Sequence, residues 1–220
     1  MAKLFIAVAC AIFLAAGCNN VPVVSLTGSD GKTRLTFELE EGGLPTYSLF
    51  YSDTVVIRNG RLGVVMADDD FSGNLTLDSV SGPVEVNDNY TLLYGKTKKA
   101  SYNARQMVVH LSNSYGKNMN IVFRLSDQGL AFCYDFPGAP GENKFIIEEK
   151  STFSFPEETV AWIQPRAASK SGWNQTNPSY EENYLMEELL SDLDADTNGY
   201  VFPALFRTGN CWVNLTESWP

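Results

Sequence analysis

From residue 25 onward the chain breaks into short runs of alternating apolar and polar residues, separated by glycine, asparagine, aspartate or proline. In residues 33–40, for example, Leu35, Phe37 and Leu39 alternate with polar neighbours, which is the pattern of a strand with one buried face. Short turns allow neighbouring strands to pair antiparallel, whereas parallel strands need long crossovers. The chain is therefore predicted to be all-β, as an antiparallel sandwich or barrel in a single domain.

One stretch, residues 180–193, has a different spacing, because Tyr184, Leu185, Leu189 and Leu190 recur near one helical face. It is the only helix that we expect. The expected strands are residues 33–40, 46–51, 54–58, 62–66, 74–80, 90–94, 105–111, 120–125, 131–136, 144–149, 159–163, 201–206 and 211–215.

The N-terminus has the pattern of an export signal. A short positive start that includes Lys3 is followed by an apolar run over residues 4–14, which is too short to span a bilayer, and then by small residues before Cys18. This order resembles a bacterial lipobox, whose cysteine is acylated, although Ala15 stands where that motif prefers leucine. We expect a signal peptide over residues 1–17, a tether over 18–24 and the folded domain over 25–220. Ordinary cleavage without acylation is the alternative.

The residues after Cys18 carry no acidic cluster. In lipoproteins of the Bacteroidetes type, an acidic stretch at that place marks export to the cell surface. We therefore expect an exported, membrane-anchored protein on the periplasmic face. In that compartment Cys133 and Cys211 are the remaining thiols. They are predicted to be buried and free, because both lie in apolar strand-like runs, and one disulfide between them is the alternative.

The charge balance excludes one class of partner. Sixteen basic residues face twenty-six acidic ones, for a net charge of -10. A duplex-DNA binder needs a basic face to neutralise phosphates, so no nucleic acid is expected as a partner. The acidic surface suits solubility and is compatible with binding of cations or neutral sugars.

No catalytic motif can be identified from the residue pattern. His110 is the only histidine, and its strand position predicts a packed or hydrogen-bonded side chain. The chain has no phosphate-binding glycine loop, no GxSxG elbow and no HExxH helix. The acidic runs at residues 68–70 and 187–188 are expected to be solvated surface charges. Spacing alone selects no pair of carboxylates for glycoside hydrolysis.

Several segments nevertheless resemble glycoside hydrolase family 97. Residues 43–51 with 62–63 are similar to its opening hairpin. Residues 122–132 and 134–136 are similar to its F-R-x-x-x-x-G-x-A-F-x-Y strand pair, with Cys133 where the family often has arginine. The segments that follow in the family's order are residues 145–153, 162, 180–184, 202–203 and 212–218. Together the matches extend over residues 25–218.

The resemblance implies a galactose mutarotase-like, antiparallel β-supersandwich that is incomplete at the C-terminus. Family 97 enzymes continue into a (β/α)8 barrel, which carries the catalytic carboxylates, and then into a small β domain. They release α-linked glucose or galactose, with calcium in the site. The resemblance therefore implies the N-terminal, substrate-pocket-completing and carbohydrate-binding domain of such an enzyme. Without the barrel, we expect no catalytic residue and no activity in the isolated chain.

The resemblance also suggests site residues. Residues 180–184 are similar to a Y-E-x-x-Y loop whose glutamate ligates calcium, which makes Glu181 the candidate ligand, and a one-residue shift would select Glu182. One carboxylate supplies few of the six to eight oxygens that Ca²⁺ takes, so weak binding is expected here. Glu217 matches a family glutamate and is a candidate for the substrate pocket. A solvent-facing acidic pair is the alternative for Glu181 and Glu182.

The expected partners are an oligosaccharide, a membrane through the lipid at Cys18, and a barrel domain that another chain could supply. Two alternatives remain open at this point. One is a stand-alone carbohydrate-binding lipoprotein, and the other is a purely structural periplasmic β protein.

The lipid anchor gives the first testable prediction. Cells fed a clickable fatty acid should label the wild-type protein, because acylation of Cys18 attaches the acyl chains that hold it on the membrane. The Cys18→Ala variant should carry no label. Label retained in that variant would contradict the lipoprotein prediction.

Overall fold

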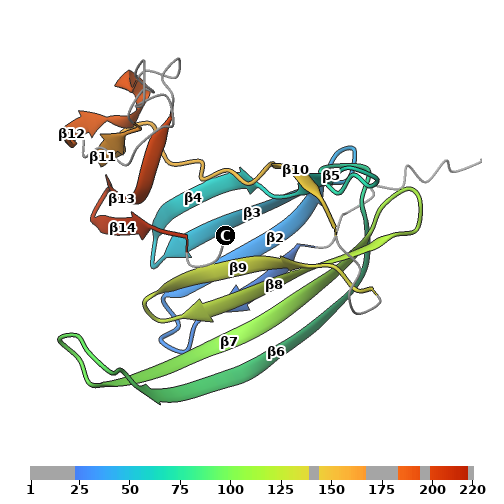
Figure 1. The fold of residues 1–220 in the computed structure, drawn as a ribbon, viewed down its shortest axis with the longest axis horizontal. Helices are drawn as coiled ribbons and strands as arrows, with labels where there is room; N and C mark the ends of the chain where they lie inside the picture. The colour runs from blue at the N-terminus through green and yellow to red at the C-terminus, as the bar shows by residue number, and fades with distance from the viewer. Residues whose placement is uncertain (1–22, 139–143, 167–182, 194–198, 218–220) are drawn as a thin grey trace, which may run out of the picture.

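The computed structural model describes residues 23–138, 144–166, 183–193 and 199–217. These residues form antiparallel strands almost throughout, arranged in four sheets (Figure 1). Within them the helical structure is limited to one 3-10 turn, η2 (Leu190–Asp192). The prediction of an all-β antiparallel sandwich is confirmed. No helix of the described residues is long and apolar enough to cross a membrane.

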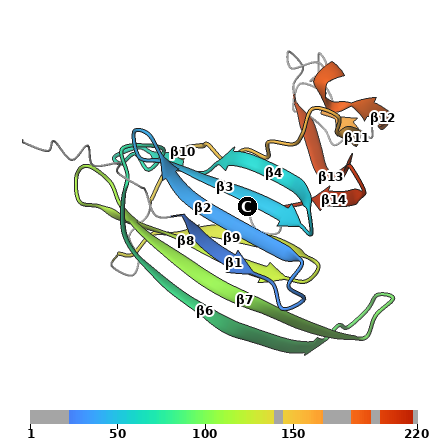
Figure 2. The same cartoon turned by 180° about the vertical axis from the view of Figure 1, so that it is seen from behind.

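Two four-stranded sheets face each other and enclose the main core (Figures 1 and 2). The first sheet contains, in spatial order, β1 (Val24–Thr27), β2 (Thr33–Glu40), β3 (Leu44–Tyr51) and β4 (Thr54–Arg61). The second sheet contains, in spatial order, β6 (Thr76–Thr91), β7 (Lys99–Ser112), β8 (Asn118–Ser126) and β9 (Gly129–Asp135).

Two smaller sheets complete the described structure. β5 (Val64–Met66) pairs with β10 (Ile146–Glu149). The other sheet, called the small sheet below, lies beyond the end of the first sheet in Figure 1. It contains, in spatial order, β12 (Leu185–Leu189), β11 (Val160–Pro165), β13 (Tyr200–Thr208) and β14 (Cys211–Leu215).

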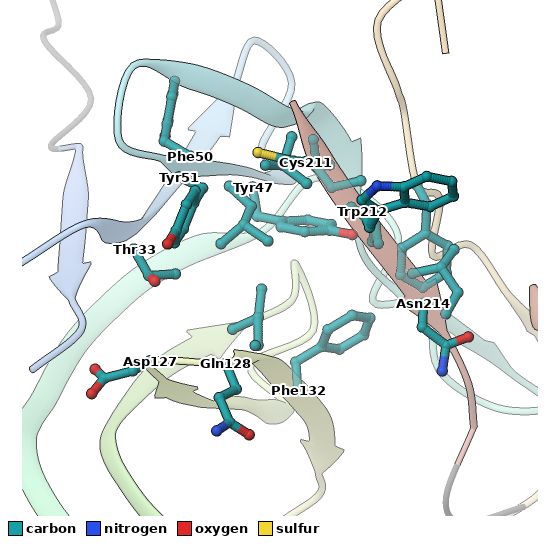
Figure 3. Close-up of a pocket in the computed structure, with 18 of the residues that line it drawn as sticks. Thr33, Tyr47, Phe50, Tyr51, Asp127, Gln128, Phe132, Cys211, Trp212 and Asn214 are labelled. Atoms are coloured by element: carbon teal, nitrogen blue, oxygen red, sulfur yellow. The ribbon is translucent and has the colours of Figure 1, made fainter. Parts of the chain in front are cut away.

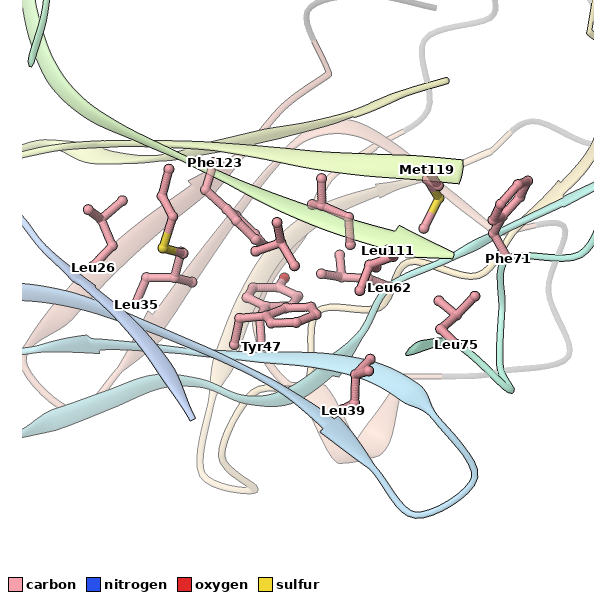
Figure 4. Close-up of a cluster of buried hydrophobic side chains, with 14 of the residues drawn as sticks. Leu26, Leu35, Leu39, Tyr47, Leu62, Phe71, Leu75, Leu111, Met119 and Phe123 are labelled. Carbon is pink, nitrogen blue, oxygen red and sulfur yellow. The ribbon is translucent and has the colours of Figure 1, made fainter. Parts of the chain in front are cut away.

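The main core follows from the alternation seen in the sequence. Leu35 and Phe37 of β2 are buried, as are Ile121 and Phe123 of β8, while their neighbours in sequence point outward. The Phe37 and Phe123 rings meet across the two sheets with centroids 6.1 Å apart. Figure 4 shows side chains of both sheets filling this space. Each such buried side chain stabilises the fold by about 1.5–3 kcal/mol relative to an exposed one.

The α-helix predicted over residues 180–193 is wrong: residues 185–189 form a strand, and among the described residues only Leu190–Asp192 make a 3-10 turn. Residues 185–189 form β12, which pairs antiparallel with β11, for example Leu185 with Ile163. A register shift in this pairing accompanies Glu187, whose φ of 63° is a left-handed conformation that no α-helix contains. Pairing of backbone groups with β11 therefore overrides the helical spacing of the leucines. Residues 180–182 lie outside the described residues.

The prediction that both thiols are buried is also wrong. Phe132 and Tyr134 take the inward positions of β9, so alternation leaves Cys133 exposed on the outer face. Cys211 is half-buried at the start of β14. Both cysteines are free thiols in the structure.

The core predicts a large difference between two phenylalanines. Phe123→Ala should lower the free energy of unfolding by about 3–5 kcal/mol, because it leaves a cavity where the 0% exposed ring lies. Phe145→Ala is the matched control, since that ring is 70% exposed and its loss should change stability by only about 0.5 kcal/mol. Urea unfolding of the two variants checks both values. Equal effects would contradict this account of the core.

Candidate functional site

A cavity of about 350 Å³ opens where β14 passes the mouth of the sandwich. Its walls come from the first sheet, from the turn between β8 and β9, and from β14 with the residue before it (Figure 3). This volume is in the range of small-molecule sites, which are mostly apolar with a few polar groups. The lining residues are Thr33, Tyr47, Leu49, Phe50, Tyr51, Val56, Ile57, Asp127, Gln128, Gly129, Leu130, Phe132, Phe153, Asn210, Cys211, Trp212, Val213, Asn214 and Leu215.

Aromatic rings form the apolar wall of the cavity. Tyr47 of β3 and Phe132 of β9 meet with ring centroids 5.8 Å apart, and Phe153 lies 6.3 Å from Phe132. Tyr47 of β3 and Phe132 of β9 point inward, and together with Phe153 they contact the main core. The cavity is thus a continuation of the sandwich interior towards solvent.

Polar groups stand around this wall. Asp127 and Gln128 lie in the turn after β8, and Asn214 lies on β14 on the opposite side of the cavity (Figure 3). Asp127 is held in place, because its Oδ1 accepts a hydrogen bond of 2.9 Å from the backbone N–H of Asp30. These groups provide donors and acceptors at the cavity edge.

Thr33 contributes a hydroxyl with no partner. The residue is 5% exposed, and among the described residues its Oγ1 makes no hydrogen bond. A buried, unsatisfied polar group costs about 1–3 kcal/mol. Thr33 also lines the cavity, and a ligand hydroxyl there would satisfy this buried atom only after the atoms that cover it move aside.

Burial disfavours the ionised form of two tyrosines, Tyr47 in the cavity wall and Tyr134 in the sandwich interior. The Tyr47 hydroxyl donates to the Thr152 carbonyl at 3.2 Å. The Tyr134 oxygen accepts from the Gly63 backbone N–H at 2.8 Å and shares a hydrogen bond of 2.6 Å with Ser151. Burial raises the pKa of Tyr134 to about 12 and raises the pKa of Tyr47 above its ordinary value too.

The site residues suggested by the sequence do not gather in this cavity. Glu217 is exposed two residues beyond β14, and it is not among the lining residues. Cys18, Glu181 and Glu182 lie outside the described residues. The acidic pair at residues 187–188 is exposed on β12, as expected of surface charges.

The described residues do not offer a calcium site. Nowhere among them do three or more histidine, cysteine, aspartate or glutamate side chains come together. Since Ca²⁺ takes six to eight oxygen ligands, this donor set does not fit the ion.

His110 has the hydrogen-bonded role that its position predicts. Its Nε2 lies 2.8 Å from Ser81 Oγ, and its Nδ1 lies 2.8 Å from Asn120 Oδ1. The Asn120 amide donates to Asp135 at 2.8 Å, which extends the network across four strands of the second sheet. His110 therefore belongs to a cross-strand polar network.

The sequence did not suggest the cavity residues Thr33 and Trp212 as site residues. The sequence did contain a signal at Trp212. Cys211, Val213 and Leu215 occupy the inward positions of the strand, so alternation predicts an outward-facing tryptophan. For Thr33 there was no signal, because an unpartnered hydroxyl is visible only in three dimensions.

Comparison with known proteins identifies related sequences. The model of the family described as "Glycosyl-hydrolase 97 N-terminal" matches residues 26–219. A curated relative, "Probable retaining alpha-galactosidase" of Streptomyces bingchenggensis (strain BCW-1), is 24% identical over 190 residues. That match covers 86% of this chain and 27% of the relative.

Solved structures have the same fold. A β-arabinopyranosidase crystal structure is similar with a TM-score of 0.82 and 33% identity, over 90% of this chain and 32% of that one. A glycoside hydrolase family 97 enzyme from Pseudoalteromonas sp. strain K8, in complex with panose, is similar in fold, with a TM-score of 0.68 and 22% identity. That likeness covers 84% of this chain and 26% of the enzyme. The chain thus spans about a third or less of the length of these relatives.

The tyrosine environment predicts a dependence of stability on alkaline pH. Tyr134 ionises near 10 when unfolded and near 12 when folded, so the unfolded chain loses this proton first. The raised pKa of Tyr134 therefore adds roughly 2–3 kcal/mol to the free energy of unfolding below about pH 10, and this contribution is lost as the pH rises towards 12. Tyr134→Phe should therefore reduce the fall in unfolding free energy between pH 9 and pH 11.5, measured with urea.

The control for this experiment is Tyr94→Phe, since Tyr94 is exposed at the tip between β6 and β7. It should keep the wild-type dependence on pH. Tyr134→Phe should also be less stable at pH 8, because the Gly63 N–H loses its acceptor. An unchanged alkaline slope in Tyr134→Phe would contradict the raised pKa.

Proposed function

The chain belongs to the family of glycoside hydrolase 97 N-terminal domains, and we propose its function on that basis. It is the substrate-pocket-completing and carbohydrate-binding domain of an enzyme that acts on α-galactosides or α-glucosides. The observation that carries this proposal is the family match over residues 26–219, which includes every described strand except the first two residues of β1. The apolar cavity with its polar edge supports the carbohydrate-binding part, because it has the composition of a site for a small polar molecule.

Relatives favour a galacto-configured substrate. One is named an α-galactosidase and another a β-arabinopyranosidase. A β-L-arabinopyranoside has the ring stereochemistry of an α-D-galactoside and lacks only its hydroxymethyl group. A site for either sugar must therefore accept an axial 4-hydroxyl. Panose and acarbose, which are bound in complexes of the Pseudoalteromonas enzyme, keep α-glucosides as the second candidate.

The chemistry of hydrolysis is assigned to a barrel outside this chain. Family 97 hydrolysis uses a pair of carboxylates, one of them a general acid, and the resemblance places both in that barrel. The proposed role of this chain is to bind sugar and to complete the pocket from one side. A barrel would come from further sequence or from another polypeptide.

Three further parts of the proposal rest on sequence. Residues 1–17 are the signal peptide, 18–24 the tether and 25–220 the domain, with a lipid at Cys18 on the periplasmic face. Glu181, or Glu182 after a one-residue shift, supplies one calcium ligand when a barrel supplies the others. Glu217 is a pocket residue of the same composite site.

The proposal predicts binding without turnover. The purified chain should release no nitrophenol from 4-nitrophenyl α-galactoside or α-glucoside in the presence of calcium, because the resemblance places the general acid and its partner in the barrel. The same preparation should bind the α-galactoside melibiose or the α-glucoside panose saturably, with a Kd of about 1 mM, by titration calorimetry.

Two outcomes would contradict the proposal. One is turnover that disappears when a carboxylate of this chain is replaced, since catalysis would then reside in the chain. The other is an absence of binding to both sugars at concentrations well above the expected Kd, which would remove the carbohydrate-binding role.

A further inference from the structure

Two tryptophans lie side by side on the outer face of the small sheet, where Trp212 is exposed and Trp162 is half-buried. The inner positions of its strands carry Ala161, Ile163 and Phe206, which are buried in a separate core cluster. Alternation places Trp162 of β11 and Trp212 of β14 on the opposite face. Trp212 is 57% exposed, although it is among the largest apolar side chains.

The two indoles and one arginine form a compact group, here called the tryptophan platform. The ring centroids of Trp162 and Trp212 are 4.9 Å apart, with planes at 40°. The guanidinium of Arg207, on the strand between them, lies 5.7 Å from the centroid of each ring. Arg207 Nη2 also lies 3.4 Å from the carboxylate of Glu187. The rings are thus held in place while Trp212 keeps much of its surface in water.

The platform adjoins the cavity. Trp212 and Asn214 lie on β14 of the small sheet and are also among the cavity-lining residues. In Figure 3 Cys211 points to the Tyr47 side of β14, whereas Trp212 and Asn214 lie on the other side. Thr33, with its unpartnered hydroxyl, lies across the cavity from them. A ligand of more than one unit would reach from the cavity over β14 to the indoles.

This combination of groups fits a neutral oligosaccharide. A pyranose ring has a C–H face and an edge of hydroxyls, and the electron-rich face of an indole attracts the partly positive C–H groups. Arg207, Glu187 and Asn214 supply the donors and acceptors that sugar hydroxyls need at the ring edge. Both charges of the platform are paired with each other, so it offers no net charge to an anionic ligand.

We infer that the tryptophan platform and the adjoining cavity form one binding site for a neutral α-linked oligosaccharide, with one ring stacked on Trp162 and Trp212 and the next ring towards Thr33. This inference rests on the proposed carbohydrate-binding function and specifies its residues. The platform is a binding surface, and no bond is made or broken on it.

The test compares sugar affinity among variants of the whole chain. Panose and melibiose are titrated by calorimetry into wild type and into Trp212→Ala, Trp162→Ala, Arg207→Gln and Thr33→Val. Each tryptophan variant should bind about tenfold more weakly, because the sugar loses an aromatic face against which its C–H groups pack. Arg207→Gln and Thr33→Val should each weaken binding about three- to tenfold, through the loss of hydrogen bonds.

The matched control is Tyr115→Ala. This aromatic is 80% exposed in the turn between β7 and β8, on the second sheet and not on the small sheet. Its removal should leave the affinity for both sugars unchanged. Circular dichroism and thermal unfolding check that each variant is folded. Should Trp212→Ala not fold, Arg207→Gln and Thr33→Val still decide the question, since unchanged affinity in both would overturn the inference.

The outcomes separate this inference from the proposed function. Wild-type affinity retained in Trp212→Ala and Trp162→Ala would overturn the platform and leave carbohydrate binding in place elsewhere. No binding by the wild type would overturn the carbohydrate-binding function, and the platform with it. Concentration-dependent dimers of the wild type that Trp212→Ala abolishes, with sugar affinity unaffected, would assign this face to a second copy of the chain instead.

Discussion

The packing of Phe132 against four other aromatic rings joins the core of the sandwich to its cavity. Its ring centroid lies 5.8 Å from Tyr47, 6.4 Å from Phe123, 6.0 Å from Tyr134 and 6.3 Å from Phe153. Phe123 belongs to the buried interior, whereas Tyr47 and Phe153 line the cavity. Because these rings pack against one another and against the core cluster, the cavity wall is supported by the core. A wall that needs no ordering on binding lowers the entropic cost of holding a ligand.

The fold was predictable to the extent that it depends on alternation. Leu35 and Phe37 face the core because a strand with one buried face needs every second residue to be apolar, and this alternation is visible in the local sequence. The same signal fails at residues 185–189, where the leucines have helical spacing but the backbone pairs with β11. Strand pairing is a long-range interaction, so a five-residue segment is decided by its neighbour in space.

The candidate site was less predictable than the fold, because it is assembled from distant parts of the chain. Thr33, Phe132 and Trp212 come from three different sheets, and no sequence spacing relates them. The exposure of Cys133 shows the same limit, since its apolar neighbours suggest burial until the register of β9 is known. The family resemblance pointed instead to Glu181, which lies outside the described residues, and to Glu217, which is exposed and does not line the cavity.

The strand β14 combines two features that soluble β proteins usually avoid. It is the last strand in the order of the small sheet, and among the described residues it pairs with β13 alone, so one edge has no strand partner. It also carries an exposed tryptophan beside the cavity. A domain whose only task was to be stable would blunt such an edge with charge or with a bulge. Here the edge carries Asn210, Asn214 and Trp212, which are suited to polar and stacking contacts. Trp212 and Asn214 lie where β14 borders the cavity, so this strand carries stacking and hydrogen-bonding groups that suit a neutral sugar.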